Sequence, residues 1–289
     1  MIVSLPDGES IDLEIERVSD LLPHEHTIPA LLDSMIRDLE RSGYQRDPII
    51  IDKKTKIVLD GMHRRAALEA AGAKFALCAC FDYEDQRISV HRWLRYFIAP
   101  DGQMLSEILA LLALEKVKDY HVAVEKVDNG ESPIALLSRE QSFCSREKYD
   151  LVTLYKRLGE FDQLAETKKI EVEFRPDVEK KSLFLSESVY VLYPLPFDKK
   201  DILEAASNRS VFPYKTTRHT VPIRPMGVYF PLTLLKGNDY EPCKQELSRI
   251  IENSKIRLVE ANSWYEGRRY PEPIVMFERE TDFPRENEK

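Results

Sequence analysis

The segment IVLDGMHRRAALEAAGA, residues 57–73, constrains the fold more than any other stretch of this chain. An apolar run ends at Asp60-Gly61, and a series of good helix formers then continues until Gly72. This order predicts a buried strand, a tight glycine turn and a helix over about 62–71. Alternation of such segments along the rest of the chain indicates an α/β or α+β fold.

Cations occupy the first turn of this predicted helix, where His63, Arg64 and Arg65 stand. The N-terminus is the positive end of the helix dipole, so cations there are unfavourable for the helix itself. The same dipole and its free N–H groups favour a bound anion such as phosphate. Two interpretations stay open: these side chains bind a phosphate, or the arginines are solvated and His63 packs or caps. Asp60 fits the N-cap of the helix, a Mg²⁺ ligand, or both.

The remaining segments predict two domains. Strands are expected at 11–17, 47–52, 56–60 and 75–82, and a helix over 28–41 stops at Gly43. Helix is expected over 103–135 and 145–167, followed by strands in IEVEF and SVYVLYPL and by helices over 198–208 and 241–254. A seam near residue 100 predicts domains at 1–100 and 101–289.

Composition excludes several classes of protein. The 289 residues are 43% hydrophobic and 32% charged, which is typical of a globular chain. A net charge of −8 argues against nonspecific binding of nucleic acid. The four cysteines form no CxxC pair, and no signal peptide or membrane-spanning segment is evident. We therefore expect a cytoplasmic protein with reduced thiols and with no nucleic-acid or membrane partner.

Further motifs carry a resemblance to a known family. The pattern D-G-x-H-R-x-A, preceded by a helix and a hairpin, resembles the ParB/sulfiredoxin-like nucleotide-binding fold. Three further motifs narrow the resemblance: PHEHT at 23–27, ISVHRW, which ends in Trp93, and KTTRH at 215–219. Together these resemble the free L-serine kinases of that superfamily, which use ADP or ATP to make O-phospho-L-serine. The similarity runs in order through residues 10–235 and is loose over 100–180; archaeal members show a second histidine where this chain has Met62.

The resemblance implies roles for individual residues. Glu25 matches the general base that activates the serine hydroxyl. Asp60 becomes a carboxylate of the Mg²⁺ or phosphate site, and Gly61 permits close approach of the backbone to phosphate. His63 and Arg64 would bind phosphates and stabilise the charge that develops during transfer, so His63 joins Glu25 and Asp60 as a catalytic residue. At helical spacing Arg65 faces another direction and is expected to be structural.

The substrate would be held by the second domain. Thr216, Thr217, Arg218 and His219 offer polar groups and a cation for the carboxylate of serine, and Trp93 walls the pocket by analogy. The nucleotide would also meet three positions near the first helix and the turn, namely Ser42, Gly43 and Met62. An active site in the cleft between a ParB/sulfiredoxin-like first domain and a mixed α/β second domain follows, in a monomer or small homo-oligomer that contributes to cysteine biosynthesis.

A different function stays open beside this one. A ParB-like protein that binds DNA and uses the nucleotide as a switch would need a helix-turn-helix module after the first domain. Residues 105–170 look helical, which leaves room for it, but the acidic charge balance and the KTTRH motif argue against it. A sulfiredoxin-like reductase would need a cysteine in the turn, and DGMHR contains none.

Overall fold

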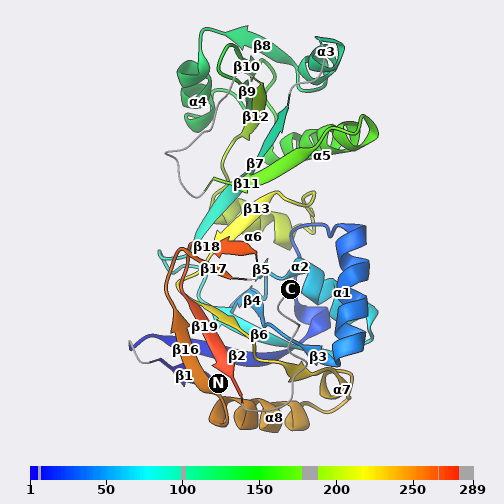
Figure 1. Cartoon of the computed structure of the whole chain (residues 1–289), viewed down its shortest axis with the longest axis vertical. Helices are drawn as coiled ribbons and strands as arrows, with labels where there is room; N and C mark the ends of the chain where they lie inside the picture. The colour runs from blue at the N-terminus through cyan, green and yellow to red at the C-terminus, as the bar shows by residue number, and fades with distance from the viewer. Residues whose placement is uncertain (6–7, 99–101, 178–187, 266, 280–289) are drawn as a thin grey trace. The chain divides into compact units, whose positions relative to one another are not determined.

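The computed structural model describes residues 1–5, 8–98, 102–177, 188–265 and 267–279 (Figure 1). The chain divides into two units, Met1–Ser89 with His219–Lys289, and Val90–Arg218. This differs from the division expected at residue 100, because the chain from His219 onward rejoins the first unit. Backbone bonds from Leu232 N to Gly43 O and from Lys74 N to Leu235 O hold it there.

A five-stranded sheet forms the centre of the first unit, in the order β1-β2-β6-β4-β5. Its strands are β1 (Ile2–Ser4), β2 (Ser10–Arg17), β4 (Ile49–Asp52), β5 (Val58–Asp60) and β6 (Phe75–Phe81). β4 and β6 pair in parallel, whereas β2 pairs with β6 in antiparallel fashion. Nearly every residue of β4 and β6 is buried, because these central strands are covered on both faces.

Two helices lie side by side, α1 (Pro29–Ser42) and α2 (Met62–Ala70), and α2 contacts β4 of this sheet (Figure 1). The predicted stop of α1 is confirmed: Gly43 has φ 74°, and its N–H donates to Leu39 O. A left-handed residue at this position satisfies a carbonyl that the helix leaves unpaired. α2 buries Ala67 and Leu68, so its apolar face packs on the sheet.

The returning chain adds a second layer to the first unit. β14 (Arg224–Met226) pairs in parallel with β19 (Ile274–Glu278), which pairs with β16 (Lys255–Val259). β15 (Phe230–Pro231) pairs with β3 (Tyr44–Gln45), directly after α1. The predicted late helix is confirmed as α8 (Tyr240–Glu252). The other elements here are the η1 turn (Val18–Asp20), α7 (Leu232–Leu235), β17 (Ser263–Tyr265) and β18 (Arg268–Tyr270).

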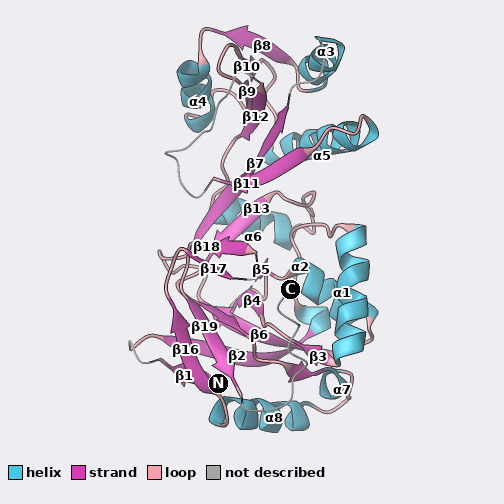
Figure 2. Ribbon diagram, in the orientation of Figure 1, coloured by secondary structure: helices cyan, strands magenta, loops and turns pink. Residues whose placement is uncertain are grey.

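The second unit is built on a seven-stranded sheet, in the order β11-β7-β12-β9-β10-β8 with β13 paired to β7. Its strands are β7 (Ser89–Ile98), β8 (Leu114–Val117), β9 (Ile134–Leu137), β10 (Ser142–Ser145), β11 (Val172–Pro176), β12 (Val189–Pro194) and β13 (Thr217–Thr220). Its helices are α3 (Gly102–Leu111), α4 (Tyr120–Asp128), α5 (Leu151–Thr167) and α6 (Lys199–Ser207). Strands and helices thus mix in both units (Figure 2), as expected of a mixed α/β fold.

Part of the helical prediction for 103–135 is wrong. β8 separates α3 from α4 because its residues pair with β10, and the side chain of Asp119 accepts from Val122 N to start α4 afresh. The DNA-binding alternative requires consecutive helices here, and a strand lies between them. Asp198 caps α6 in a reciprocal capping box with Asp201.

Two buried arginines anchor β7 in the second unit. The guanidinium of Arg95 donates to both carboxylate oxygens of Asp162, at 2.8 and 2.9 Å. Arg92 donates to Asp177 and Asp128 and lies over the ring of Tyr193. Burial raises the pKa of Asp162, and the charge of Arg95 opposes this shift.

Among the described residues, no helix is both long and apolar enough to cross a membrane.

Candidate active site

The strand-turn-helix junction forms as predicted, but its cap differs. β5 ends at Asp60, Gly61 is the N-cap of α2 with φ 104°, and no side chain caps the helix. The interpretation of Asp60 as the N-cap is therefore wrong, because Asp60 is the last residue of the strand. Its carboxylate pairs with guanidinium groups instead of the helix N–H groups.

Asp60 binds two arginines through one oxygen. Its Oδ2 accepts from Arg64 Nη2 at 3.1 Å and from Arg224 Nη1 at 2.7 Å. Burial alone would raise the pKa of Asp60, but Arg224, Arg64 and Arg268 together hold that pKa far below its usual range. The carboxylate is consequently ionised, and the cations around it outnumber it.

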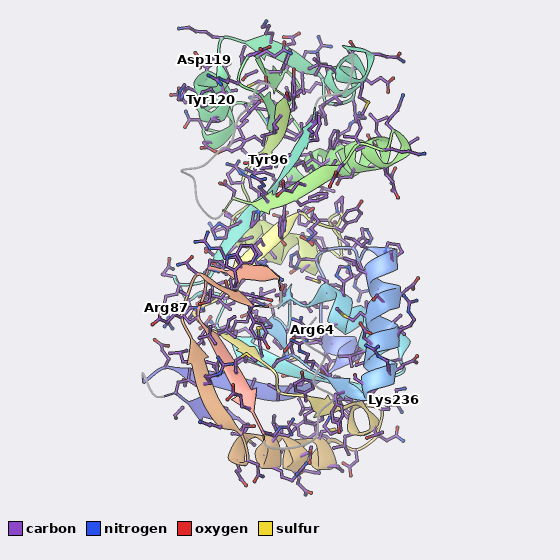
Figure 3. The ribbon with its side chains drawn as sticks, viewed as in Figure 1. Arg64, Arg87, Tyr96, Asp119, Tyr120 and Lys236 are labelled. Atoms are coloured by element: carbon purple, nitrogen blue, oxygen red, sulfur yellow. The ribbon has the colours of Figure 1, made fainter. Side chains whose placement is uncertain are left out.

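Gly61 lets Arg64 fold back over the turn. A Cβ at Gly61 would lie 3.0 Å from Arg64 Nη2 and 3.1 Å from its Nε. Figure 3 shows Arg64 where β5 and α2 meet. The Nε of Arg64 and the Nη2 of Arg224 are buried and have no hydrogen-bond partner in the described part of the chain. Buried donors of this kind are costly unless a ligand or water satisfies them.

The loop that carries Glu25 is held to this junction on both sides. Leu22 bridges to Ile57 before β5, and the N–H of Ile28 donates to His63 Nε2 at 2.9 Å. Glu25, which is half-buried, lies three residues from each anchor. Because His63 accepts this bond at Nε2, its ring proton lies on Nδ1. Arg65 donates to Leu21 O and pairs with Glu69, as expected of a structural residue.

Two histidines and a tyrosine pack together in the first unit. The hydroxyl of Tyr83 and His219 Nε2 are 2.8 Å apart, and the His24 and His219 rings meet edge to face. Burial lowers the pKa of His24 to about 4, and a hydrogen bond with the backbone of Val58 opposes the shift. His24 is therefore a neutral packing residue near physiological pH, whereas His26 is exposed.

Four of the five predicted substrate residues lie in the second unit, and the fifth, His219, lies in the first. Trp93 Nε1 donates to Thr217 O at 2.8 Å, and Lys215 Nζ lies 4.4 Å from the centroid of the Trp93 ring. Thr216 is buried and donates to Pro213 O. Arg218 is only 4% exposed, and its Nε has no hydrogen-bond partner among the described residues.

Two predicted nucleotide residues lie apart from the junction. Ser42 and Gly43 end α1, whereas His63 contacts Ile28 at the start of that helix. The helix has 14 residues, so its ends are about 20 Å apart. Ser42 bonds to the backbone of Leu39 and Tyr44. Met62 opens α2 and is half-buried.

The residues at Asp60 do not fit a resident magnesium ion. One oxygen of this carboxylate is engaged by two guanidinium groups, and the nearby Glu272 pairs with Arg224. In the described ranges, three potential ligand groups come together at Glu14, Glu16 and Cys80, and Asp60 is not among them. A resident magnesium ion is held by carboxylate oxygens, whereas the carboxylates here are already paired with guanidinium groups, so the donor set favours an anion.

Sequence reasoning missed Arg224 and Glu272. Arg224 follows the KTTRH segment in VPIRP, and Glu272 lies between two prolines in YPEP. Both are 4% exposed. A charged residue within an apolar, proline-rich stretch was the available signal, because burial of such a residue requires a partner.

Comparisons with known proteins find similarity to serine kinases over most of the chain. An ADP-dependent L-serine kinase of Thermococcus kodakarensis is 25% identical over 221 residues, which cover 75% of this chain and 90% of that protein. An ATP-dependent L-serine kinase of Staphylothermus marinus is 26% identical, covering 76% and 89%. A free serine kinase variant solved in complex with AMP matches with a TM-score of 0.67 and 26% identity, covering 78% and 94%. No protein-family model matches the chain.

Proposed function

The chain is a relative of the free serine kinases, as its motifs predicted, and we propose that it phosphorylates free L-serine to O-phospho-L-serine with ADP or ATP. The observation that carries the proposal is the attachment of the Glu25 loop to the arginine-bearing turn, through Leu22–Ile57 and Ile28–His63. A base and a phosphate site must be neighbours for phosphoryl transfer, since catalysis depends mainly on alignment.

The turn supplies the phosphate half of the proposed site. The N-terminus of α2 presents free N–H groups at the positive end of the helix dipole. Arg64 adds a guanidinium group that Gly61 allows to lie against the backbone. Three arginines, Arg64, Arg224 and Arg268, face the two carboxylates of Asp60 and Glu272, and the excess positive charge attracts phosphate. His63 would add a donor from the first turn of the helix.

Glu25 is the proposed general base. The serine hydroxyl attacks the terminal phosphorus of the nucleotide and passes its proton to the Glu25 carboxylate. The bond between that phosphorus and the bridging oxygen breaks, so that ADP leaves as AMP, or ATP leaves as ADP. Glu25 is half-buried, so its carboxylate can contact the serine hydroxyl where little bulk water is present.

Arg218 is the proposed partner of the substrate carboxylate. A buried guanidinium without an anion costs stability, so its retention at 4% exposure supports a ligand of opposite charge. Thr217 and Trp93 would shape the same pocket.

Magnesium is proposed as part of the nucleotide substrate. Mg²⁺ is commonly held by one or two carboxylates together with substrate phosphates and water. It would neutralise charge on the phosphates, and Asp60 offers at most its Oδ1 to such an ion.

A kinase assay tests this function. Purified protein, serine and Mg²⁺ are incubated with ADP or ATP, and phosphoserine is measured by mass spectrometry; threonine, homoserine and sugar alcohols are run as competing acceptors. We expect phosphoserine with at least one nucleotide. Absence of product with both nucleotides across neutral pH overturns the proposal, and preference for another acceptor overturns the assignment of serine.

A pair of variants tests the base. Glu25→Gln is expected to bind ADP normally and to turn over at least about 100-fold more slowly, because general base catalysis contributes that much. His26→Gln, an exposed change one residue away, is the matched control. Normal turnover in Glu25→Gln would remove Glu25 from this role.

A further inference from the structure

Arg224 and Glu272 form the most deeply buried charged pair beside Asp60, and neither belongs to a motif of the predicted site. Arg224 Nε donates to Glu272 Oε1 at 2.6 Å, while its Nη1 donates to Asp60. The side chains of Arg224 and Glu272 are 5% and 2% exposed. The free energy needed to remove two charges from water is rarely offset by their attraction in the interior, so stability alone does not explain this buried pair.

We propose that Arg224 is a second phosphate-binding arginine, which acts beside Arg64, and that Glu272 is the residue that positions it. This inference rests on the proposed function, since the phosphate is that of the nucleotide. It assigns a role to the segment after residue 240, because Glu272 comes from the turn before β19.

The geometry of Arg224 leaves one donor for a ligand. Two of its three guanidinium nitrogens are bonded to carboxylates, and the third, Nη2, is buried without a partner among the described residues. Arg64 repeats this arrangement: its Nη2 is bonded to Asp60, and its Nε is buried without a partner in the same described ranges. Both arginines meet the same Asp60 oxygen, so the two guanidinium groups are neighbours that one phosphate can bridge.

Glu272 prevents Arg224 from directing a second guanidinium nitrogen to Asp60. The backbone around Glu272 is fixed, because Arg224 N donates to Pro273 O and Arg224 pairs with Ile274 between β14 and β19. Prolines on both sides of Glu272 restrict its φ/ψ range further. Glu272 and Asp60 therefore hold the guanidinium of Arg224 from two directions, in one orientation.

The charges in this cluster favour an anion. Asp60 and Glu272 supply two negative groups, whereas Arg64, Arg224 and Arg268 supply three positive ones. Arg268 is exposed and lies over the Tyr270 ring, at 5.0 Å from its centroid. The excess positive charge suits a phosphate that approaches from the side of Arg268.

Calorimetric titration of the full chain with ADP and with adenosine tests the role of Arg224. Arg224→Lys keeps the charge but loses the planar guanidinium, whose separate nitrogens reach Glu272, Asp60 and a phosphate in different directions. We expect ADP affinity to fall about 10- to 100-fold, as for loss of a charge-assisted hydrogen bond, and adenosine affinity to stay unchanged. Arg257→Lys, at an exposed pair with Glu278 in the same sheet, is the control.

Glu272→Gln tests the positioning role, because Gln keeps the shape and the acceptor but removes the charge. With Glu272 neutral, Arg224 turns toward Asp60, and we expect ADP affinity to fall severalfold with adenosine affinity unchanged. Loss of a negative charge by itself would strengthen ADP binding. A rise in ADP affinity therefore overturns the positioning role of Glu272.

The outcomes separate this inference from the proposed function. Equal losses for ADP and adenosine in Arg224→Lys, or no loss for either, overturn the phosphate role of Arg224 while leaving serine kinase activity in the wild type intact. A selective loss for ADP in a wild type that makes no phosphoserine supports the phosphate site and overturns the kinase. Absence of binding of both ADP and ATP in the wild type overturns both.

Discussion

Replacement of Gly61 by alanine separates two roles of the turn. Gly61 has φ 104°, so any side chain there is strained, and its Cβ would lie 3.0 Å from Arg64 Nη2. Gly72, at the other end of α2, has φ 78°, and a Cβ at that position would have no atom within 4 Å among the described residues. Gly72→Ala thus carries the backbone strain without the contact with Arg64.

The expected magnitudes follow from these contacts. A left-handed backbone costs an alanine about 1–2 kcal/mol relative to glycine, so both variants should melt a few degrees lower. In Gly61→Ala the guanidinium of Arg64 must also move, which weakens its bond to Asp60 and its reach toward a phosphate. Loss of one charge-assisted hydrogen bond is about 1.5–3 kcal/mol, or roughly 10- to 100-fold in ADP affinity.

Two measurements check this prediction. Circular dichroism gives Tm for the wild type and both variants, and calorimetric titration gives their affinity for ADP. We expect similar losses of Tm, with weakened ADP binding in Gly61→Ala alone. Wild-type ADP affinity in Gly61→Ala would refute the assignment of the turn to phosphate, and equal weakening in Gly72→Ala would show that strain, not Arg64, is responsible.

Three further predictions concern buried charge. Burial lowers the pKa of His24 to about 4, so the free energy of unfolding should fall by about 3 kcal/mol in total as pH falls from 6.5 toward 4. His24→Asn should flatten this pH dependence in urea titrations, and His26→Asn should leave it unchanged. Asp162→Ala should cost about 3–5 kcal/mol of unfolding free energy by leaving Arg95 unpaired, against less than about 1 kcal/mol for the exposed Glu173→Ala. Arg218→Met should raise the KM for serine about 100-fold without lowering Tm, and a normal KM would contradict the carboxylate role.

Local chemistry made much of the first unit predictable. The stop of α1 at Gly43, the turn at Gly61 and, in the second unit, the α6 cap at Asp198 each depend on residues within one helical turn. The same locality explains two errors. Asp60 looked like a cap because its position fits one, and 103–135 looked helical because pairing between β8 and β10 is invisible to local pattern.

The sequence by itself determined the strand, the glycine turn and the helix that place His63 and Arg64, together with the motifs that identify the relatives of this chain. Only the tertiary structure decided what Asp60 binds. Its partner Arg224 is 164 residues away, and Glu272 joins through the pairing of β14 with β19. Helix and turn preferences act over a few residues, whereas an ion pair between distant segments depends on how the chain returns to its first unit, which no local pattern encodes.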